Sequence, residues 1–196
     1  LKKYSVIDIE TDGLDIKDAI NWTGIHTWDD DDDEGEYIIL DHSVDDLSIL
    51  KEMDNTIKIF HNGKFDTKML KYQGVADLQI QHDTMFLVYI LSTASELINN
   101  RGKGWLSLKK AAMRLLGAPD WDVDLDKKTS KSRKDVEEYL KKDLYWTRKL
   151  YEYCKKHIDK EDIPTYLLMI QASNVYRDIE LNGLPINKKQ LLETKE

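Results

Sequence analysis

Two carboxylates stand at the end of a short apolar run, Tyr4-Ser5-Val6-Ile7-Asp8-Ile9-Glu10, where acidic side chains are not expected. This run predicts a strand over residues 4–10, and side chains alternate between the two faces of a strand. Asp8 and Glu10 therefore share one face with Val6. Neighbouring carboxylates repel each other and resist burial, and protonation, a cationic side chain or a bound metal ion would each relieve this. A hard divalent cation, which prefers oxygen ligands, is the hypothesis that explains most.

Two further acids stand at unusual positions. Asp66 falls in the first turn of an expected helix that directly follows an apolar strand, so the helix N-terminus would hold it at the edge of the sheet. Asp143 falls within the apolar stripe of a long expected helix, with Tyr139 one turn before it on the same face. Each acid alone could be a turn residue, a helix cap or a partner for an arginine. Together they indicate a site.

The elements that must position these residues follow from the periodicity of apolar residues and from turn and cap signals. Strands are expected over residues 4–10, Ile20–Trp28, Glu36–Leu40 and Ile57–Phe60. Helices are expected over Val44–Met53, Lys64–Tyr72, Thr84–Leu91 after a cap at Asp83, Ser107–Leu116, from a cap at Ser132 to about His157, and from Pro164 to Asn182. This order predicts an α/β domain with a mixed sheet, followed by a helical tail.

Three segments, in order along the chain, resemble the three exonuclease motifs of the DEDD superfamily: Asp8-Ile9-Glu10-Thr11-Asp12-Gly13-Leu14, Asn62-Gly63-Lys64-Phe65-Asp66 and Tyr139-Leu140-Lys141-Lys142-Asp143. The tyrosine places the resemblance in the tyrosine subgroup, because the histidine subgroup would need a histidine where Glu138 stands. The resemblance implies an RNase H-like fold, a mixed β-sheet flanked by helices. It also implies two divalent metal ions, Mg²⁺ or Mn²⁺.

The resemblance also implies a role for each matched residue. Asp8 would bridge both metal ions, Glu10 and Asp143 would hold the ion that carries the nucleophilic water, and Asp66 would hold the second ion, largely through water. Tyr139 would complete the catalytic set by orienting the attacking water with its hydroxyl. Positions that bind substrate in the family are matched by Thr11, Leu14, Asn62 and Phe65. Leu14 matches a wedge against the last base, although a leucine after a glycine is also a natural core residue.

A second resemblance concerns the C-terminal part of the chain. The segment from Tyr176 to Asn187 resembles the one that joins the exonuclease domain to the polymerase domain in family-A, DNA polymerase I-like enzymes. We therefore expect an exonuclease domain over residues 1–160, and over 161–196 a helix and linker toward a polymerase domain that this chain lacks. The implied function is proofreading: two-metal-ion hydrolysis of the 3′-terminal phosphodiester of DNA, which releases nucleoside monophosphates.

Two other functions remain open from the sequence. A stand-alone RNase D-like 3′–5′ exoribonuclease shares the tyrosine pattern of the third motif. A catalytically silent, nuclease-derived DNA-binding module would share the fold, but such a module would be expected to lose acids that are intact here. Asp83 is expected to cap a helix and not to be a fifth metal ligand.

The charge of the chain restricts how it can bind nucleic acid. Lysine and arginine total 29 against 37 acids, a net charge of −8, whereas proteins that wrap duplex DNA are usually basic. We expect a single-stranded or frayed 3′ end, held through metal ions and local basic loops. The Arg101–Trp105 segment either contacts single-stranded DNA or is a mobile surface loop. The same alternatives, phosphate contact or a solvated loop, apply to Lys127, Lys128, Lys131, Arg133 and Lys134.

The remaining features predict an ordinary intracellular protein. No apolar stretch approaches the length of a membrane span, so no membrane partner is expected. The lone Cys154 cannot form an internal disulfide and should pack in the core. The acidic run Asp29–Glu34 lacks the spacing of a calcium loop and should be a solvated hairpin turn. We expect a monomer in the cytoplasm of a bacterium or a phage-infected cell.

Overall fold

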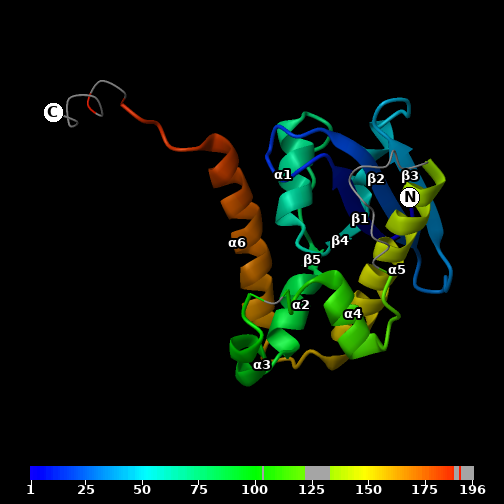
Figure 1. Cartoon of the computed structure of the whole chain (residues 1–196), viewed down its shortest axis with the longest axis vertical. Helices are drawn as coiled ribbons and strands as arrows, with labels where there is room; N and C mark the ends of the chain where they lie inside the picture. Colours follow the sequence, from blue (N-terminus) through cyan, green and yellow to red (C-terminus); the bar gives the residue numbers. More distant parts are fainter. Residues whose placement is uncertain (103, 122–132, 188–189, 191–196) are drawn as a thin grey trace.

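The computed structural model describes residues 1–102, 104–121, 133–187 and 190, and it contains a five-stranded mixed sheet in the order β3-β2-β1-β4-β5 (Figure 1). The central strand β1 (Tyr4–Thr11) pairs antiparallel with β2 (Ile20–Trp28) and parallel with β4 (Ile57–Phe60). The edge strands are β3 (Glu36–Asp41) and β5 (His82–Asp83). The expected α/β fold with a mixed sheet is confirmed.

The helices follow the sheet strands in the order that the sequence predicts. They are α1 (Lys64–Tyr72), α2 (Thr84–Leu91), α3 (Ala94–Asn99), α4 (Leu108–Leu116), α5 (Arg133–His157) and α6 (Ile163–Asn182). The short strand β5 and helix α3 were not expected. The cap expected at Ser132 and the basic residues Lys127, Lys128 and Lys131 lie outside the described residues.

The prediction of a helix over residues 44–53 is wrong. Two short 3₁₀ turns, Ser48–Leu50 and Met53–Asn55, take its place. The side chain of Asp46 accepts a hydrogen bond from the backbone N–H of Ser48, at 2.9 Å. Similar bonds join the nearby aspartates 41 and 45 to the backbone. Such local side-chain bonds offer the backbone an alternative to a helix. The segment still buries Leu50 and Met53.

A close approach at Gly24 brings α5 onto the sheet. Gly24 lies opposite Asp8 in the β1–β2 register. A Cβ atom at Gly24 would stand 2.9 Å from Cδ1 of Leu144, which is fully buried on α5. The absence of a side chain therefore lets α5 pack closely against the sheet. Because Asp143 precedes Leu144, this packing places it beside the strand that carries Asp8.

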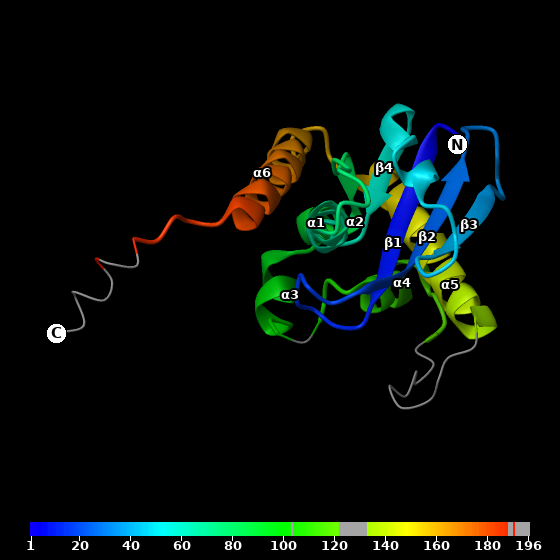
Figure 2. The same cartoon turned by 90° about the horizontal axis from the view of Figure 1, so that it is seen from above.

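Helix α6 lies beyond α1 and α2 as seen from the sheet (Figures 1 and 2). It is anchored to α1 by ion pairs, since Glu180 meets Lys64 at 2.5 Å and Lys68 at 3.0 Å. Arg177 is fully buried, donates to the carbonyl oxygen of Leu78 and pairs with Asp178 at 2.9 Å. The last helix is thus fastened to the helix that carries Asp66.

Three further expectations concern features away from the site. The acidic run 29–34 forms the expected exposed hairpin turn, in which Lys2 pairs with Asp32 at 2.6 Å and Arg148 donates to the carbonyl oxygen of Asp32 at 2.8 Å. Cys154 is buried in the core, as expected. Among the described helices, none is both long and apolar enough to cross a membrane.

Candidate active site

Three of the predicted metal ligands come together at the end of the central strand. Oxygen atoms of Asp8, Glu10 and Asp143 all lie within 4.8 Å of one another. Asp8 and Glu10 are half-buried on β1, and Asp143 is buried on α5. The β1–β2 register shifts directly after Glu10, and such bulges re-aim side chains beside functional sites. The fold thus supplies a cluster of carboxylates from two elements far apart in the sequence.

Asp66 joins this cluster from α1. It is 5% exposed, and its Oδ1 accepts a hydrogen bond from the backbone N–H of Ile9 at 3.2 Å, between the two acids of β1. Burial, with smaller contributions from the charges of Asp83 and Glu10, raises the pKa of Asp66 to about 7. Asp66 thus lies at the end of the central strand, beside the two acids of β1.

The pKa of Asp8 is raised well above its ordinary value, first by burial and then by the charges of Asp66, Asp143 and Glu10. The four acids therefore form one electrostatic unit that resists full ionisation in the absence of a cation. Their donor set consists of carboxylate oxygens, which suit a hard divalent cation such as Mg²⁺ or Mn²⁺. The residues present fit the metal ions that the sequence implies.

Tyr139 stands one turn before Asp143 and retains its proton at neutral pH. Burial, then the charge of Asp143, raises the pKa of Tyr139 to about 12, despite the opposing effect of Lys109. The Lys109 ammonium donates to the Tyr139 hydroxyl at 3.1 Å and lies 4.9 Å from the centre of its ring. Because the hydroxyl oxygen accepts this bond, its own hydrogen is free to point toward another acceptor. Sequence reasoning did not find Lys109, which lies in none of the three motifs.

Trp121 also contacts the third motif without belonging to it. Its indole Nε1 donates to Oδ1 of Asp143 at 2.6 Å, and its ring stacks on Trp146. Trp121 belongs to none of the three motifs and has no diagnostic spacing from them, so no sequence signal singled it out.

The turn that leads into α1 is held by Asp83. This fully buried carboxylate accepts from the backbone N–H groups of Asn62 at 3.0 Å, Gly63 at 2.8 Å and Met85 at 2.9 Å. The bond from Met85 confirms the predicted cap of α2. Asn62 has a positive φ of 64°, and a Cβ atom at Gly63 would stand 2.4 Å from Cβ of Phe60. The tight turn that places Asp66 therefore needs both its glycine and this buried acceptor.

The predicted substrate-binding residues lie at different depths. Leu14 is 88% exposed, so its alternative assignment as a core residue is wrong. Asn62 is also exposed, whereas Phe65 is half-buried and packs against the core. Thr11 donates from its hydroxyl to the carbonyl oxygen of Gly13 at 2.6 Å and so braces the loop that carries Leu14.

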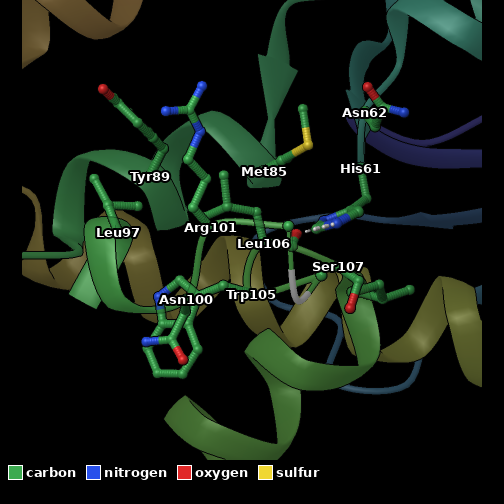
Figure 3. A pocket seen from close by; sticks show the side chains of 13 residues that line it. His61, Asn62, Met85, Tyr89, Leu97, Asn100, Arg101, Trp105, Leu106 and Ser107 are labelled. Atoms are coloured by element: carbon green, nitrogen blue, oxygen red, sulfur yellow. Dashed lines mark hydrogen bonds between the residues drawn. The ribbon is translucent and has the colours of Figure 1, made fainter.

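A cavity of about 620 Å³ lies beside this turn, between α2, α3 and the start of α4 (Figure 3). His61 and Asn62 line it from the turn, and Arg101 and Trp105 line it from the loop before α4. Burial lowers the pKa of His61 to about 4, so its ring is neutral at pH 7. His61 Nε2 then donates to the carbonyl oxygen of Leu106 at 2.9 Å, which ties the turn to the loop (Figure 3).

The sequence of the chain matches the family model of the 3′–5′ exonuclease domain over residues 2–159. The chain belongs to the 3′–5′ exonuclease family. Members of the DEDD superfamily use two divalent metal ions, in agreement with the carboxylate cluster of this exonuclease domain. No curated protein sequence is significantly similar to the chain.

Solved structures with a similar fold include several nucleases. NrnC from Brucella melitensis aligns with a TM-score of 0.68 and 18% identity over 93% of this chain and 86% of its own, and a Mg²⁺-bound form also aligns. The catalytic core of RRP6 from Trypanosoma brucei aligns with a TM-score of 0.59 and 16% identity over 90% of this chain and 46% of its own. Escherichia coli RNase D is described as an exoribonuclease involved in structured RNA processing. It aligns with a TM-score of 0.59 and 16% identity over 90% of this chain and 45% of its own. These similarities confirm the RNase H-like fold of the exonuclease.

The raised pKa of Asp66 predicts how the stability of the metal-free exonuclease depends on pH. Between about pH 4 and pH 7 the unfolded chain has released this proton while the folded chain retains it, so stability decreases as pH rises. The free energy of unfolding should fall by about 1.4 kcal/mol per pH unit in this window for one such group. Asp66→Asn should reduce the slope in urea unfolding, and Mg²⁺ should stabilise wild type more at pH 7 than at pH 5. An unchanged slope in Asp66→Asn would contradict this assignment.

The bond between Lys109 and Tyr139 predicts coupled effects on the exonuclease rate. Tyr139→Phe should lower the single-turnover rate by about 10–10³-fold, the loss associated with one positioned hydrogen bond. Lys109→Met should lower it by about 10-fold, because the hydroxyl loses the donor that orients it. If Lys109 acts through the hydroxyl, the double variant should be no slower than Tyr139→Phe alone. Lys110→Met, on the exposed side of the same helix, is the control, and additive effects would exclude the coupling.

Proposed function

We propose that the protein hydrolyses the 3′-terminal phosphodiester bond of a single-stranded nucleic acid and releases nucleoside monophosphates one at a time. The observation that supports this most strongly is the convergence of Asp8, Glu10, Asp66 and Asp143 at one end of the sheet, with Tyr139 beside them. The presence of all four acids and the tyrosine argues against a catalytically silent DNA-binding module.

Within this proposal each residue of the cluster has a role. Asp8 would hold both cations, Glu10 and Asp143 one of them, and Asp66 the other. When bound, the two cations supply a nucleophile at neutral pH and stabilise charge on the attacking and leaving oxygens. Tyr139, whose high pKa makes it a poor base, would instead orient the attacking water through its hydroxyl.

The surfaces around the cluster suggest where the strand would lie. Leu14, with its exposed side chain, would pack against the last base, and Asn62 would contact the same terminal nucleotide. Phe65 and Thr11 would support this pair from the core side. The cavity lined by Arg101 and Trp105 offers a cation and an aromatic ring, which suit a phosphate and a base of the preceding nucleotides.

RNA is one candidate substrate. None of the solved structures reported above is described as part of a polymerase. One of them, RNase D, is described as an exoribonuclease. These comparisons support a stand-alone exoribonuclease better than they support a proofreading domain.

DNA is the second candidate, in the setting of a family-A polymerase. The segment from Tyr176 to Asn187 favours it, because it resembles the connection to a polymerase domain. On α6 the side chains of Leu168, Val175 and Ile179 are 65%, 57% and 51% exposed, and an apolar surface of this kind favours a covering partner such as a polymerase domain in cis. In this setting residues 1–160 are the exonuclease domain, in a cytoplasmic and otherwise monomeric polymerase.

One experiment tests the function and separates the two candidates. Single-stranded DNA and RNA of equal sequence, each labelled at the 5′ end, are incubated with the protein and Mg²⁺, and in parallel with EDTA. We expect a ladder that shortens from the 3′ end and disappears with EDTA. Faster shortening of RNA would support the exoribonuclease and faster shortening of DNA the proofreading domain. Intact substrates with Mg²⁺ and Mn²⁺, or cleavage that persists in EDTA, would overturn the proposed function.

A further inference from the structure

Trp121 makes a buried hydrogen bond to the third motif. Its Nε1 lies 2.6 Å from Oδ1 of Asp143, and the two residues are 5% and 8% exposed. An indole N–H can only donate, so the carboxylate oxygen is the acceptor. Bonds of this kind to an ionised acceptor are among the stronger hydrogen bonds in proteins. The contact therefore restricts one particular oxygen of a proposed metal ligand.

The position of the indole ring is fixed independently of this bond. Helix α4 ends at Leu116, the following Gly117 turns the chain with a φ of 66°, and Ala118 is buried next to it. Trp121 then stacks on Trp146, with ring centroids 5.7 Å apart and 20° between the planes. Trp146 follows Asp143 by one turn of α5, so the ring lies along the helix that carries the acid. The donor is thus held in place by packing.

A fixed donor matters for Asp143 because the neighbouring carboxylates of Asp8 and Glu10 repel its charge. The torsion that rotates an aspartate carboxylate is broad and roughly two-fold, so rotation alone is inexpensive. Without a cation, the charges of Asp8 and Glu10 would favour turning the carboxylate away from the cluster. A bond from Trp121 to one oxygen restricts this rotation and sets the plane in which the other oxygen lies.

We propose that Trp121 is a positioning residue that fixes the carboxylate of Asp143 in the orientation required for metal binding. This inference rests on the proposed function, since it assumes that Asp143 holds a cation. Partners that orient a metal ligand in this way commonly contribute 10–100-fold to metal affinity or activity. Trp121 does not contact substrate in this proposal and acts only through Asp143.

Two substitutions separate the hydrogen bond from the packing of the ring. Trp121→Phe retains an aromatic ring that can stack on Trp146 but removes the N–H. Trp121→His retains an N–H at the corresponding position of a five-membered ring but removes the bulk of the indole. Trp146→Phe, which alters the same stack and leaves the Trp121 donor in place, is the matched control. Mn²⁺ binding by calorimetry, the urea unfolding free energy and single-turnover cleavage are measured for each full chain.

We expect Trp121→Phe to bind Mn²⁺ about 10–100-fold more weakly and to need correspondingly more metal for cleavage, while losing less stability than Trp121→His. Trp121→His should be less stable but should retain most of the Mn²⁺ affinity, and Trp146→Phe should bind Mn²⁺ as wild type does. Wild-type affinity in Trp121→Phe, or equal losses of affinity in all three variants, would overturn the positioning role. Absence of Mn²⁺ binding by wild type would instead overturn the proposed function on which this inference rests.

Discussion

Asp8→Ala should abolish detectable removal of 3′ nucleotides, a loss of at least about 10³-fold if the cations supply several kcal/mol of transition-state stabilisation. Asp8 stands at the centre of the cluster, where Asp66, Asp143 and Glu10 all raise its pKa. The measurement is the single-turnover cleavage of a 5′-labelled strand at saturating Mg²⁺ or Mn²⁺.

The same substitution should leave the fold intact and even favour it without metal. Because the folded protein holds the Asp8 carboxyl at a raised pKa, its ionised form destabilises the fold at neutral pH, and removing it relieves this cost. Metal-free Asp8→Ala should therefore be at least as stable as wild type in urea at pH 8. Asp12→Ala, an exposed acid at the end of the same strand, is the control and should cleave at nearly the wild-type rate. Cleavage by metal-loaded Asp8→Ala at the wild-type rate would overturn the site assignment.

Asp83→Ala should have the largest effect on stability. The substitution leaves three backbone N–H groups, those of Asn62, Gly63 and Met85, without the buried carboxylate that accepts their hydrogen bonds. Each such loss costs about 1–3 kcal/mol, and the Met85 bond also caps α2, so a total of roughly 3–5 kcal/mol is expected. Because the turn before α1 would be released, the cleavage rate should also fall in the fraction that remains folded.

The unfolding free energy in urea and the cleavage rate under native conditions test this together. Asp46→Ala is the matched control, because exposed Asp46 also accepts from a backbone N–H, that of Ser48, at 2.9 Å. It should cost less than about 1 kcal/mol, since water can replace an exposed acceptor. Equal losses of stability in the two variants would show that Asp83 is an ordinary surface cap and does not hold the turn.

The sequence predicted those parts of the fold that local periodicity determines. The four longer strands, and the helices that carry Asp66 and Asp143, could be recognised because their apolar residues repeat at strand or helix spacing. The segment 44–53 was mistaken for a helix because apolar spacing was read without the aspartates that bond its backbone. The two-residue strand β5 is defined by its neighbour β4, which no local pattern can report.

The site shows the same division between local pattern and tertiary contact. Asp8, Glu10, Asp66, Tyr139 and Asp143 were found because motif spacing is a property of the chain itself. Lys109 and Trp121 were missed because their contacts exist only after α4 and the residues that follow it pack against α5. Asp83 was predicted as a cap, but its bonds to the turn before α1 depend on β5 lying beside β4.

The contacts that hold α6 against the rest of the fold affect where a stable fragment of this nuclease can end. The family match ends at residue 159, before α6 begins. Yet the Tyr166 hydroxyl on α6 accepts a hydrogen bond from the backbone N–H of Asp83 at 3.1 Å, and Arg177 donates one to the carbonyl oxygen of Leu78. A fragment cut at residue 160 would lose these partners and expose the apolar sides of α1 and α2. We therefore expect a recombinant fragment that ends at or after Gly183 to be more stable than one cut at residue 160, as urea unfolding of the two fragments would show.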